Sequence, residues 1–311
     1  MSCHSARNSQ PAATHQATAP STPTRPRIVH VIPTLRVAGL ENVVLRLTDE
    51  LRTVLDHVVI TPAGDGPLRA RFPEGVPVIA MAEHHRPDLW NAVRMARLFR
   101  ALRPDIVHSR NWSCVDAILG ARLARVPVVI HGEHGREAAD PEGRNPLRKR
   151  LRRLLAPLVT QFVTVSLDLA RWLIEDVGIP VRKVTTIGNG VDTRRFDGRD
   201  REDARRALRI PDGGIAIGTV GRLDPVKDQL GLVRAFARLA GDPRALLLIA
   251  GDGPCRRELE TAVAALGLTG RVRLLGERAD VPRVLAGLDV FALSSLGEGI
   301  SNTILEAMAT G

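Results

Sequence analysis

Hydrophobic and polar positions alternate between two kinds of segment from residue 27 to the end of the chain. Short apolar runs rich in Val, Ile and Leu are typical of strands buried on both faces of a parallel sheet. Stretches in which apolar residues recur every three or four positions are typical of amphipathic helices. In the first half we expect strands at 28–32, 57–61, 76–80, 105–109, 126–131 and 162–166, separated by helices at 39–52, 88–103, 115–125 and 166–177.

A Gly-rich, polar turn at 184–192 closes this first series, and a second series of the same kind follows. Two series of strands separated by helices predict an α/β protein of two Rossmann-like domains that face a cleft. We place the N-terminal domain at 27–188 and the C-terminal domain at 189–311. The expected strands of the second series are 216–221, 245–251, 272–276 and 289–295, and its helices are 226–240, 255–266, 280–287 and a last one from about 301.

The composition adds limits to this architecture. Residues 1–26 consist mostly of Ser, Thr, Ala, Pro and Gln, which cannot bury a core, so we expect a disordered tail without a folded role. Three isolated cysteines favour neither a disulfide framework nor a zinc site, and they suit a reducing cytoplasm. Since no apolar run approaches the length of a membrane span, we expect a cytoplasmic protein, soluble or peripheral to the membrane.

The charge of the chain is strongly basic. Lys and Arg total 44 against 34 acidic residues, a formal net charge of +10. Such a charge favours polyanionic partners, namely nucleic acid, anionic lipid headgroups or phosphorylated small molecules, without choosing among them.

Candidate chemistry lies where strands end, because ligands of open α/β sheets bind at the carboxyl ends of the strands. Gly39 follows the first strand at the start of a helix, but the segment lacks the GxGxxG pattern of dinucleotide binding. His131, Glu133 and His134 cluster after the fifth strand. They do not complete a metal site, so they either position a substrate hydroxyl or form structural hydrogen bonds.

The C-terminal domain has a second group of charged residues at strand ends. Arg222 and Lys227 are five positions apart and could reach the same diphosphate, or they could be a solvated surface pair. Glu298 lies in a glycine-bracketed turn, and Glu306 lies on the helix that begins near Ser301. Eight residues of helix rise about 12 Å, so the two carboxylates would touch different parts of an elongated ligand.

Four fragments together resemble a known family. GRLDPVK (221–227), GDGP (251–254), NGVDTRRF (189–196) and GEGISNTILEAMATG (297–311) look like the motifs of retaining glycosyltransferases of family 4, which have the GT-B fold. The resemblance spans 27–311. It implies transfer of a sugar from a nucleotide-diphosphate sugar with retention of anomeric configuration, with 27–188 on the acceptor side and 189–311 binding the donor.

The resemblance also implies roles for individual residues. Arg222 and Lys227 would neutralise the donor phosphates, and Glu306 would contact the ribose hydroxyls. Glu298 would contact the donor sugar, with Gly299 and Ile300 completing the donor-binding turn. No cofactor and no metal would be required, because fixed cations and helix N-termini stabilise the leaving diphosphate.

On the N-terminal side, the resemblance implies that His134 is catalytic together with Glu298 and lies near the reacting sugar. Gly39 and Glu41 match the first-loop segment of the family, which is close to GGxE. This sequence has Ala38 in place of the first glycine, so the match at that loop is incomplete.

A narrower likeness involves HSRNW (108–112), IHGEHGRE (130–137), LRKRLRRLLAP (147–157) and VSLDLARWL (165–173). These segments look like the sugar transferases associated with exosortase exopolysaccharide loci, which implies a bacterial exopolysaccharide or cell-envelope role and a glycan or lipid-linked acceptor. Family members normally continue beyond the point that corresponds to Gly311. The resemblance therefore implies that the second domain lacks its final strands and helices, and that an extended version is more soluble or more active.

A basic amphipathic stretch at 144–153 contains six Arg or Lys residues next to Leu147, Leu151, Leu154 and Leu155. Such a stretch either rests on an anionic membrane surface or forms a solvated helix whose leucines pack inward.

Two other functions compete with the transferase. A nucleic-acid-binding protein would explain the basic charge, but the chain has no Tyr and few other aromatic residues for base stacking. An inactive nucleotide-sugar-binding module would have the same motifs without turnover.

Overall fold

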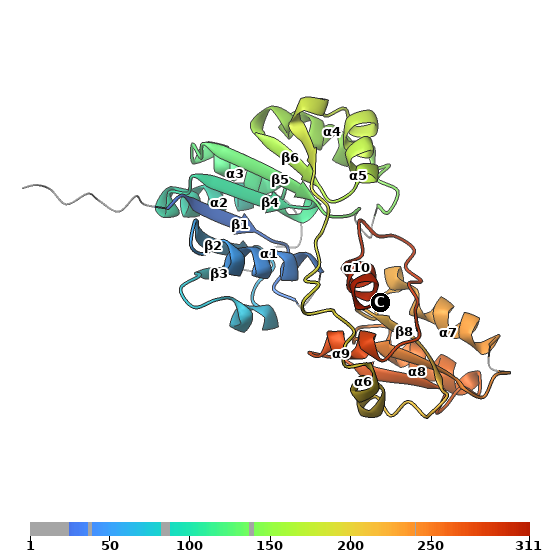
Figure 1. Ribbon diagram of the computed structural model, residues 1–311. Helices are drawn as coiled ribbons and strands as arrows, with labels where there is room; N and C mark the ends of the chain where they lie inside the picture. Colours follow the sequence, from blue (N-terminus) through green and yellow to red (C-terminus); the bar gives the residue numbers. More distant parts are fainter. Residues whose placement is uncertain (1–24, 37–38, 82–87, 137–139, 240) are drawn as a thin grey trace, which may run out of the picture.

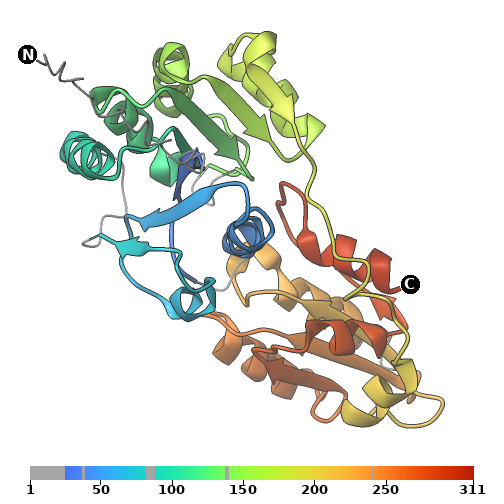
Figure 2. The ribbon, with the colours of Figure 1, turned by 60° about the vertical axis from the view of Figure 1, so that its left-hand side comes forward.

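A computed structural model describes residues 25–36, 39–81, 88–136, 140–239 and 241–311. These residues form two sheets in which every pair of neighbouring strands is parallel, so the α/β class with two Rossmann-like domains is confirmed. The chain passes from one domain to the other through residues 187–200, seen as the yellow-green segment in Figure 2. No helix among the described residues has the length and apolar character needed to cross a membrane.

The N-terminal sheet has seven strands in the order β3-β2-β1-β4-β5-β6-β7. Successive strands move outward in one direction from β1 and then in the other direction from β4, which puts a topological switch point between β1 and β4. The strands are β1 (Arg27–Val31), β2 (Asp56–Thr61), β3 (Val78–Ala80), β4 (Ile106–Arg110), β5 (Val128–Glu133), β6 (Gln161–Thr164) and β7 (Val184–Thr186); the helices are α1 (Gly39–Glu50), α2 (Leu89–Leu102), α3 (Asp116–Leu123), α4 (Pro146–Leu155) and α5 (Leu167–Arg171).

The C-terminal sheet has four strands in the order β10-β9-β8-β11, with its switch point between β8 and β11. Its central strand β9 is buried at all six positions, as expected for a strand with helices on both faces. The strands are β8 (Ile215–Val220), β9 (Ala245–Ala250), β10 (Val272–Gly276) and β11 (Val290–Phe291); the helices are α6 (Arg201–Ala207), α7 (Gln229–Ala237), α8 (Arg256–Ala265), α9 (Val281–Ala286) and α10 (Asn302–Thr310).

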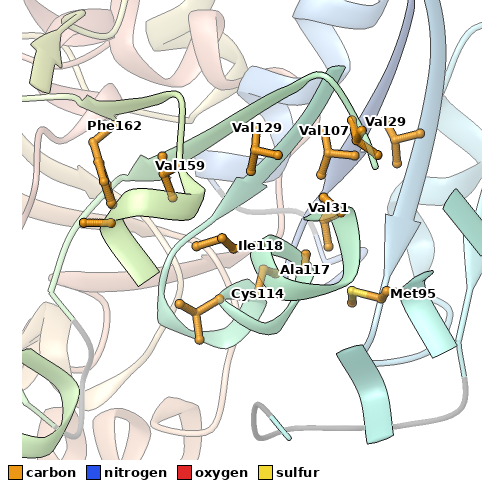
Figure 3. Close-up of a cluster of buried hydrophobic side chains, with 14 of the residues drawn as sticks. Val29, Val31, Met95, Val107, Cys114, Ala117, Ile118, Val129, Val159 and Phe162 are labelled. Atoms are coloured by element: carbon orange, nitrogen blue, oxygen red, sulfur yellow. The ribbon is translucent and has the colours of Figure 1, made fainter. Parts of the chain in front are cut away.

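One face of the N-terminal sheet packs on α2, α3 and the segment after α4 through a continuous apolar core (Figure 3). Side chains alternate between the two faces of a sheet, so every second residue of each strand lies on this face. The labelled members of this core are Val29, Val31, Met95, Val107, Cys114, Ala117, Ile118, Val129, Val159 and Phe162. A smaller cluster that includes Leu35 and Val44 packs α1 against the opposite face.

The structure differs from the expected elements at several boundaries. Within the segment 184–192, expected to be a turn throughout, the β-branched residues Val184–Thr186 form the edge strand β7, paired with β6. The expected helix at 166–177 is α5, capped by the Ser166 hydroxyl, followed by a π-helical turn at Trp172–Val177. The expected strand at 289–295 pairs only over Val290–Phe291.

The face of the N-terminal sheet under α1 also contains buried histidines. His30 on β1 and His108 on β4 are register partners, so their side chains lie next to each other. The imidazole of His30 stacks on that of His57, with an Nε2 to Nδ1 distance of 3.0 Å. Burial, reinforced by the positive charge of Arg110, holds the pKa of His30 and of His108 well below its usual value.

Because His30 and His108 are buried and uncharged, we expect the protein to lose stability in mild acid. A histidine that resists protonation in the folded protein accepts its proton on unfolding, so the free energy of unfolding should fall as the pH drops below about 6.5. Each such histidine should contribute a slope of about 1.4 kcal/mol per pH unit. Urea denaturation between pH 7.5 and 5.5 measures this slope, and His30→Gln should reduce it. A free energy of unfolding that does not change over this range would contradict the assignment.

Candidate functional site between the two domains

The loops that follow the strands at the two switch points face each other across the domain boundary. In the N-terminal domain these loops follow β1 and β4, and in the C-terminal domain they follow β8 and β11. The helix α10 lies on the side of the C-terminal domain that faces the N-terminal domain (Figure 1). Ligands of doubly wound sheets bind at such switch points, so the candidate site lies at this boundary.

On the C-terminal side, the loop after β11 is attached to the turn after β8. The Ser294 hydroxyl donates to the carbonyl oxygen of Lys227 at 2.9 Å, and the backbone N–H of Leu296 donates to that of Val226 at 2.9 Å. Lys227 forms an ion pair with Glu298, so these two predicted site residues are in direct contact. The turn itself is the short 3₁₀ helix Pro225–Lys227, for which the Asp224 side chain is the N-cap.

Arg222 precedes this turn and forms an ion pair with Asp224. Its side chain is 44% exposed, whereas those of Lys227 and Glu298 are 28% and 24% exposed. An incoming anion can therefore reach Arg222, and it would compete with Glu298 for Lys227. Both cations are paired with carboxylates, Lys227 with Glu298 and Arg222 with Asp224.

Glu306 does not share a partner with Glu298. It lies on α10 and approaches Arg46 of α1, with an Nη2 to Oε1 distance of 3.5 Å. In the same helix, the Asn302 side-chain amide donates to the carbonyl oxygen of Gly39 at 3.2 Å. Burial raises the pKa of Glu306, and the positive charges of Arg46 and Arg195 partly offset that effect. The first turn of α1 and α10 are thus joined across the boundary.

Glu41 lies in the first turn of α1 and is only 6% exposed. Its Oε1 accepts a hydrogen bond from the Thr34 hydroxyl at 2.7 Å. Burial raises the pKa of Glu41, while the Thr34 hydrogen bond and the positive charge of Arg222 across the boundary act in the opposite direction. Glu41 is therefore a fixed acceptor near Arg222 of the C-terminal domain. Ala38, where the sequence departs from the family motif, lies outside the described residues.

His134 follows β5 and is fixed through its backbone. The N–H of His134 donates to Oδ1 of Asn111 at 2.8 Å, and the N–H of Asn111 donates to the Gly132 carbonyl at 2.7 Å. Asn111 has a φ of 57°, in the left-handed region that a residue other than glycine rarely adopts. Such strain is typical of a residue held in place at a functional site.

The turn that contains His134 packs directly on the turn that contains Glu298. A Cβ added at Gly299 would lie 2.9 Å from the carbonyl carbon of His134 and 3.2 Å from Cα of Gly135. Both neighbours are backbone atoms, so neither can rotate away. The next residue, Ile300, packs on the N-terminal core, and its carbonyl accepts from the Asn189 side chain at 3.5 Å.

The histidine cluster expected after β5 divides between the two faces of the sheet. Alternation along the strand turns His131 and Glu133 toward the side opposite His134. There His131 is hydrogen-bonded to Ser109 at 2.8 Å, and Glu133 pairs with the buried Arg152 at 2.6 Å. Burial alone would raise the pKa of Glu133, but the guanidinium of Arg152 holds it down, at about 2. His131 and Glu133 are thus structural, and only His134 reaches the domain boundary.

Three residues at the candidate site were not predicted from the sequence. Arg46 pairs with Glu306, Thr34 donates to Glu41, and Asn111 holds His134. Asn111 lies in HSRNW, a segment noted only for its likeness to a subfamily. Within the part of the chain that the structure describes, no group of three or more His, Cys, Asp or Glu residues could hold a metal ion. Independence from metal remains a prediction.

Known families match both domains of the chain. The model of Glycosyltransferase Family 4 matches residues 37–195, and the model of Glycosyl transferases group 1 matches residues 214–311. The UDP-Gal:alpha-D-GlcNAc-diphosphoundecaprenol alpha-1,3-galactosyltransferase of Escherichia coli is 28% identical, over 94% of this chain and 79% of its own length. The GDP-mannose-dependent alpha-mannosyltransferase of Mycolicibacterium smegmatis is 29% identical, over 88% of this chain and 74% of its own length.

Solved structures agree on the fold. The crystal structure of Anabaena HepE in complex with UDP and glucose superposes with a TM-score of 0.76 at 22% identity, over 91% of this chain and 78% of HepE. Because the Family 4 model matches half of the chain and the group 1 model covers the second domain, the chain belongs to Glycosyltransferase Family 4 and is a nucleotide-sugar glycosyltransferase with the GT-B fold.

Proposed function

We propose that this protein transfers a sugar from a nucleotide-diphosphate sugar to a glycan or lipid-linked acceptor, with retention, in exopolysaccharide or cell-envelope synthesis. The main support is the contact between the His134 turn and the Glu298 turn, next to the cations Arg222 and Lys227. This arrangement brings His134 of the N-terminal domain to the same boundary as the carboxylate of Glu298 and the cations Arg222 and Lys227 of the C-terminal domain.

The donor diphosphate would bind to Arg222 and Lys227 and to the free backbone N–H groups at the start of α10. During transfer the leaving nucleotide diphosphate gains negative charge, and fixed cations stabilise that charge without a metal ion. Diphosphate binding would release Glu298 from Lys227. The carboxylate of Glu298 could then contact the donor sugar, with Gly299 and Ile300 at the same turn.

His134 is the group of the N-terminal domain proposed to touch the reacting sugar. Burial first, and then the positive charge of Arg110, lower its pKa to about 3, so the imidazole is uncharged at neutral pH. A neutral imidazole can accept a hydrogen bond from a sugar hydroxyl. Gly39 and Glu41 would complete the site from the first loop, and Glu306 would leave Arg46 to contact the ribose.

The donor nucleotide and the acceptor are proposed only by class. The Escherichia coli relative is named for UDP-Gal and a diphosphoundecaprenol acceptor, and the Mycolicibacterium smegmatis relative for GDP-mannose. A carboxylate such as Glu306 does not distinguish these nucleotides, because both contain ribose. The likeness to exosortase-associated transferases remains a prediction that supports the exopolysaccharide role.

A panel of nucleotide sugars tests the donor site. The correct donor should raise the melting temperature of the protein and turn over, and Glu298→Ala should lower turnover by about 100-fold or more, as expected for loss of a group that acts on the reacting sugar. The exposed Glu258→Ala on α8 is the matched control and should leave turnover unchanged. Stabilisation by a donor without any turnover would favour the inactive binding module, and salt-sensitive binding of oligonucleotides instead would favour a nucleic-acid-binding protein.

The glycine contact between the domains gives a second test. Gly299→Ala places a methyl group against the backbone of His134 and Gly135, so the two turns must separate. A shift of about 1 Å at a reacting centre can cost about 100-fold in rate. Gly297→Ala is the control, because its Cβ meets no atom within 4 Å. Equal kcat/KM for the two variants would rule out a catalytic need for this contact.

Exposed leucines and basic residues on α4 support peripheral binding of the protein to an anionic membrane surface. The alternative that its leucines pack inward is wrong for three of them: Leu147, Leu151 and Leu154 are 64%, 37% and 63% exposed, and only Leu155 packs on the core. Of the basic residues, Arg152 turns inward to Glu133. Arg148 lies over the Trp112 ring with a buried Nη1, and Nε of Arg153 donates to the Val177 carbonyl at 2.7 Å. Arg144, Lys149 and Arg150 remain beside the leucines and could contact lipid headgroups.

Flotation with liposomes that contain anionic phospholipid tests this surface. We expect wild-type protein to float with anionic and not with neutral liposomes, and Leu147→Ser combined with Leu154→Ser to remain at the bottom of the gradient. Leu239→Ser removes a leucine of the C-terminal domain that is 55% exposed and should not change flotation. Flotation of the double variant at the wild-type level would refute a role for α4.

A further inference from the structure

A row of polar side chains crosses the N-terminal sheet beneath α1 and ends beside the candidate site. His57 on β2 contacts His30 on β1 at 3.0 Å between ring nitrogens. Nη2 of Arg110, on β4, lies 3.2 Å from Nδ1 of His30 and 3.1 Å from Nδ1 of His108. Beyond His108 lies Gly132. A Cβ there would be 3.2 Å from Nε2 of His108 and 3.0 Å from Nε2 of His134.

Arg110 is a buried charge without a counter-ion among the described residues. Its side chain is 0% exposed, and its hydrogen-bond partners among the described residues are the His108 carbonyl and the two imidazole nitrogens. Nε of Arg110 has no partner at all. Burial lowers the pKa of Arg110 to about 9, so the guanidinium is still charged at neutral pH. The other buried arginine, Arg152, is paired with Glu133.

An unpaired buried charge is costly, which makes a purely structural role for Arg110 a poor explanation. A charge of this kind strongly affects any titratable group nearby because little water screens it. The group at the end of the row is His134. Arg110 therefore lies where it can control both the charge and the hydrogen bonding of the site.

The guanidinium also determines the tautomers along the row. An arginine only donates hydrogen bonds, so Nδ1 of His30 and Nδ1 of His108 must accept, and both imidazoles have their proton on Nε2. His30 then donates from Nε2 to Nδ1 of His57. Nε2 of His108 has no partner among the described residues and is a buried donor on the side of Gly132, toward His134.

We propose that Arg110 is a positioning residue for the transferase reaction: it orients His108 and, through its unpaired charge, keeps His134 an uncharged acceptor for a sugar hydroxyl. This inference rests on the proposed role of His134. Nε2 of His108 and Nε2 of His134 lie on the same side of Gly132, so this free donor could bind a hydroxyl group that approaches His134. The absence of a side chain at Gly132 leaves the space in which the two imidazoles approach each other.

Other charges near His134 are consistent with this assignment. From β5, Glu133 favours the charged imidazole and His131 opposes it, and the charge of Glu133 is compensated by Arg152 of α4. From β4, Arg110 opposes protonation and His108 lies beside it. On the side of the C-terminal domain, the backbone of Gly299 packs on the backbone of His134, and Glu298 beside it pairs with Lys227. Arg110 is thus the one uncompensated charge among these described neighbours.

The experiment is a titration of His134 by NMR, using its ring Cε1–H signal in ligand-free protein from pH 8 to pH 4. Wild-type His134, with a pKa of about 3, should remain mostly uncharged over this range. Arg110→Gln should raise the midpoint by about one pH unit or more, which is a tenfold change in the proton-binding constant, so that the midpoint comes within reach at the acid end. Arg122→Gln, which removes an arginine bound only to backbone carbonyls and Thr160, is the control and should match wild type.

A second variant separates charge from orientation and covers a failure of Arg110→Gln to fold. Arg110→Lys keeps the charge but cannot bridge both imidazoles, so the His134 midpoint should stay low while the ¹⁵N shifts of His108 report a changed tautomer. Superimposable His134 curves for wild type and folded Arg110→Gln, or an unchanged His108 tautomer in Arg110→Lys, would overturn the inference.

Kinetics distinguish this inference from the proposed function. If His134 acts on the sugar, the acid limb of kcat/KM should move to higher pH in Arg110→Gln by the same interval as the NMR midpoint. If His134→Ala retains full turnover, the proposed role of His134 fails. The NMR result would still establish that Arg110 controls the charge of that imidazole.

Discussion

The site depends on one close approach of two backbones, at which the turn of His134 and Gly135 meets the turn of Glu298 and Gly299. Only glycine permits this approach, since any Cβ at Gly299 would meet main-chain atoms that cannot move aside. The His134 turn follows β5 directly and the Glu298 turn lies in the loop between β11 and α10, so the contact joins the two domains. The neighbouring pairs, Arg46 with Glu306 and Asn302 with Gly39, are on the helices that these sheets support.

Charged side chains have different kinds of partner at the domain boundary and in the interior of the N-terminal domain. At the boundary Lys227 pairs with Glu298 and Arg222 pairs with Asp224, and a diphosphate could replace these carboxylates. Beneath the N-terminal sheet surface, Glu133 and Arg152 neutralise each other, which suits a structural pair in a dry interior. Arg110 has no such partner among the described residues, and its neighbours are imidazoles whose protonation it opposes. The basic composition of the chain thus includes cations with distinct tasks.

Much of the fold and part of the site could be predicted from the sequence. Continuous apolar runs such as 245–250 identify buried parallel strands, and ligands of such sheets bind at strand ends. Arg222 and His134 lie directly after β8 and β5, and Glu298 lies in the loop between β11 and α10. The short elements were harder. Val184–Thr186 lacks an apolar run because it is an edge strand, and β11 pairs over only two residues. Periodicity alone could not separate His131 and Glu133 from His134, because this depends on which face of the sheet each residue occupies.

The sequence by itself determined the class of fold, the number of domains and the residue types that suit a diphosphate and a sugar, because these follow from local periodicity and from motifs within a few residues. Only the tertiary structure decided which of these residues meet. Arg46 and Glu306 are far apart in the chain, as are His134 and Gly299, and their contacts exist only once two sheets are packed together. The tertiary structure likewise decided that Arg110 is buried without a counter-ion while Leu147 and Leu154 are exposed. Burial is a property of the packed chain and not of a segment, so the charge state of His134 could not be read from its neighbours in sequence.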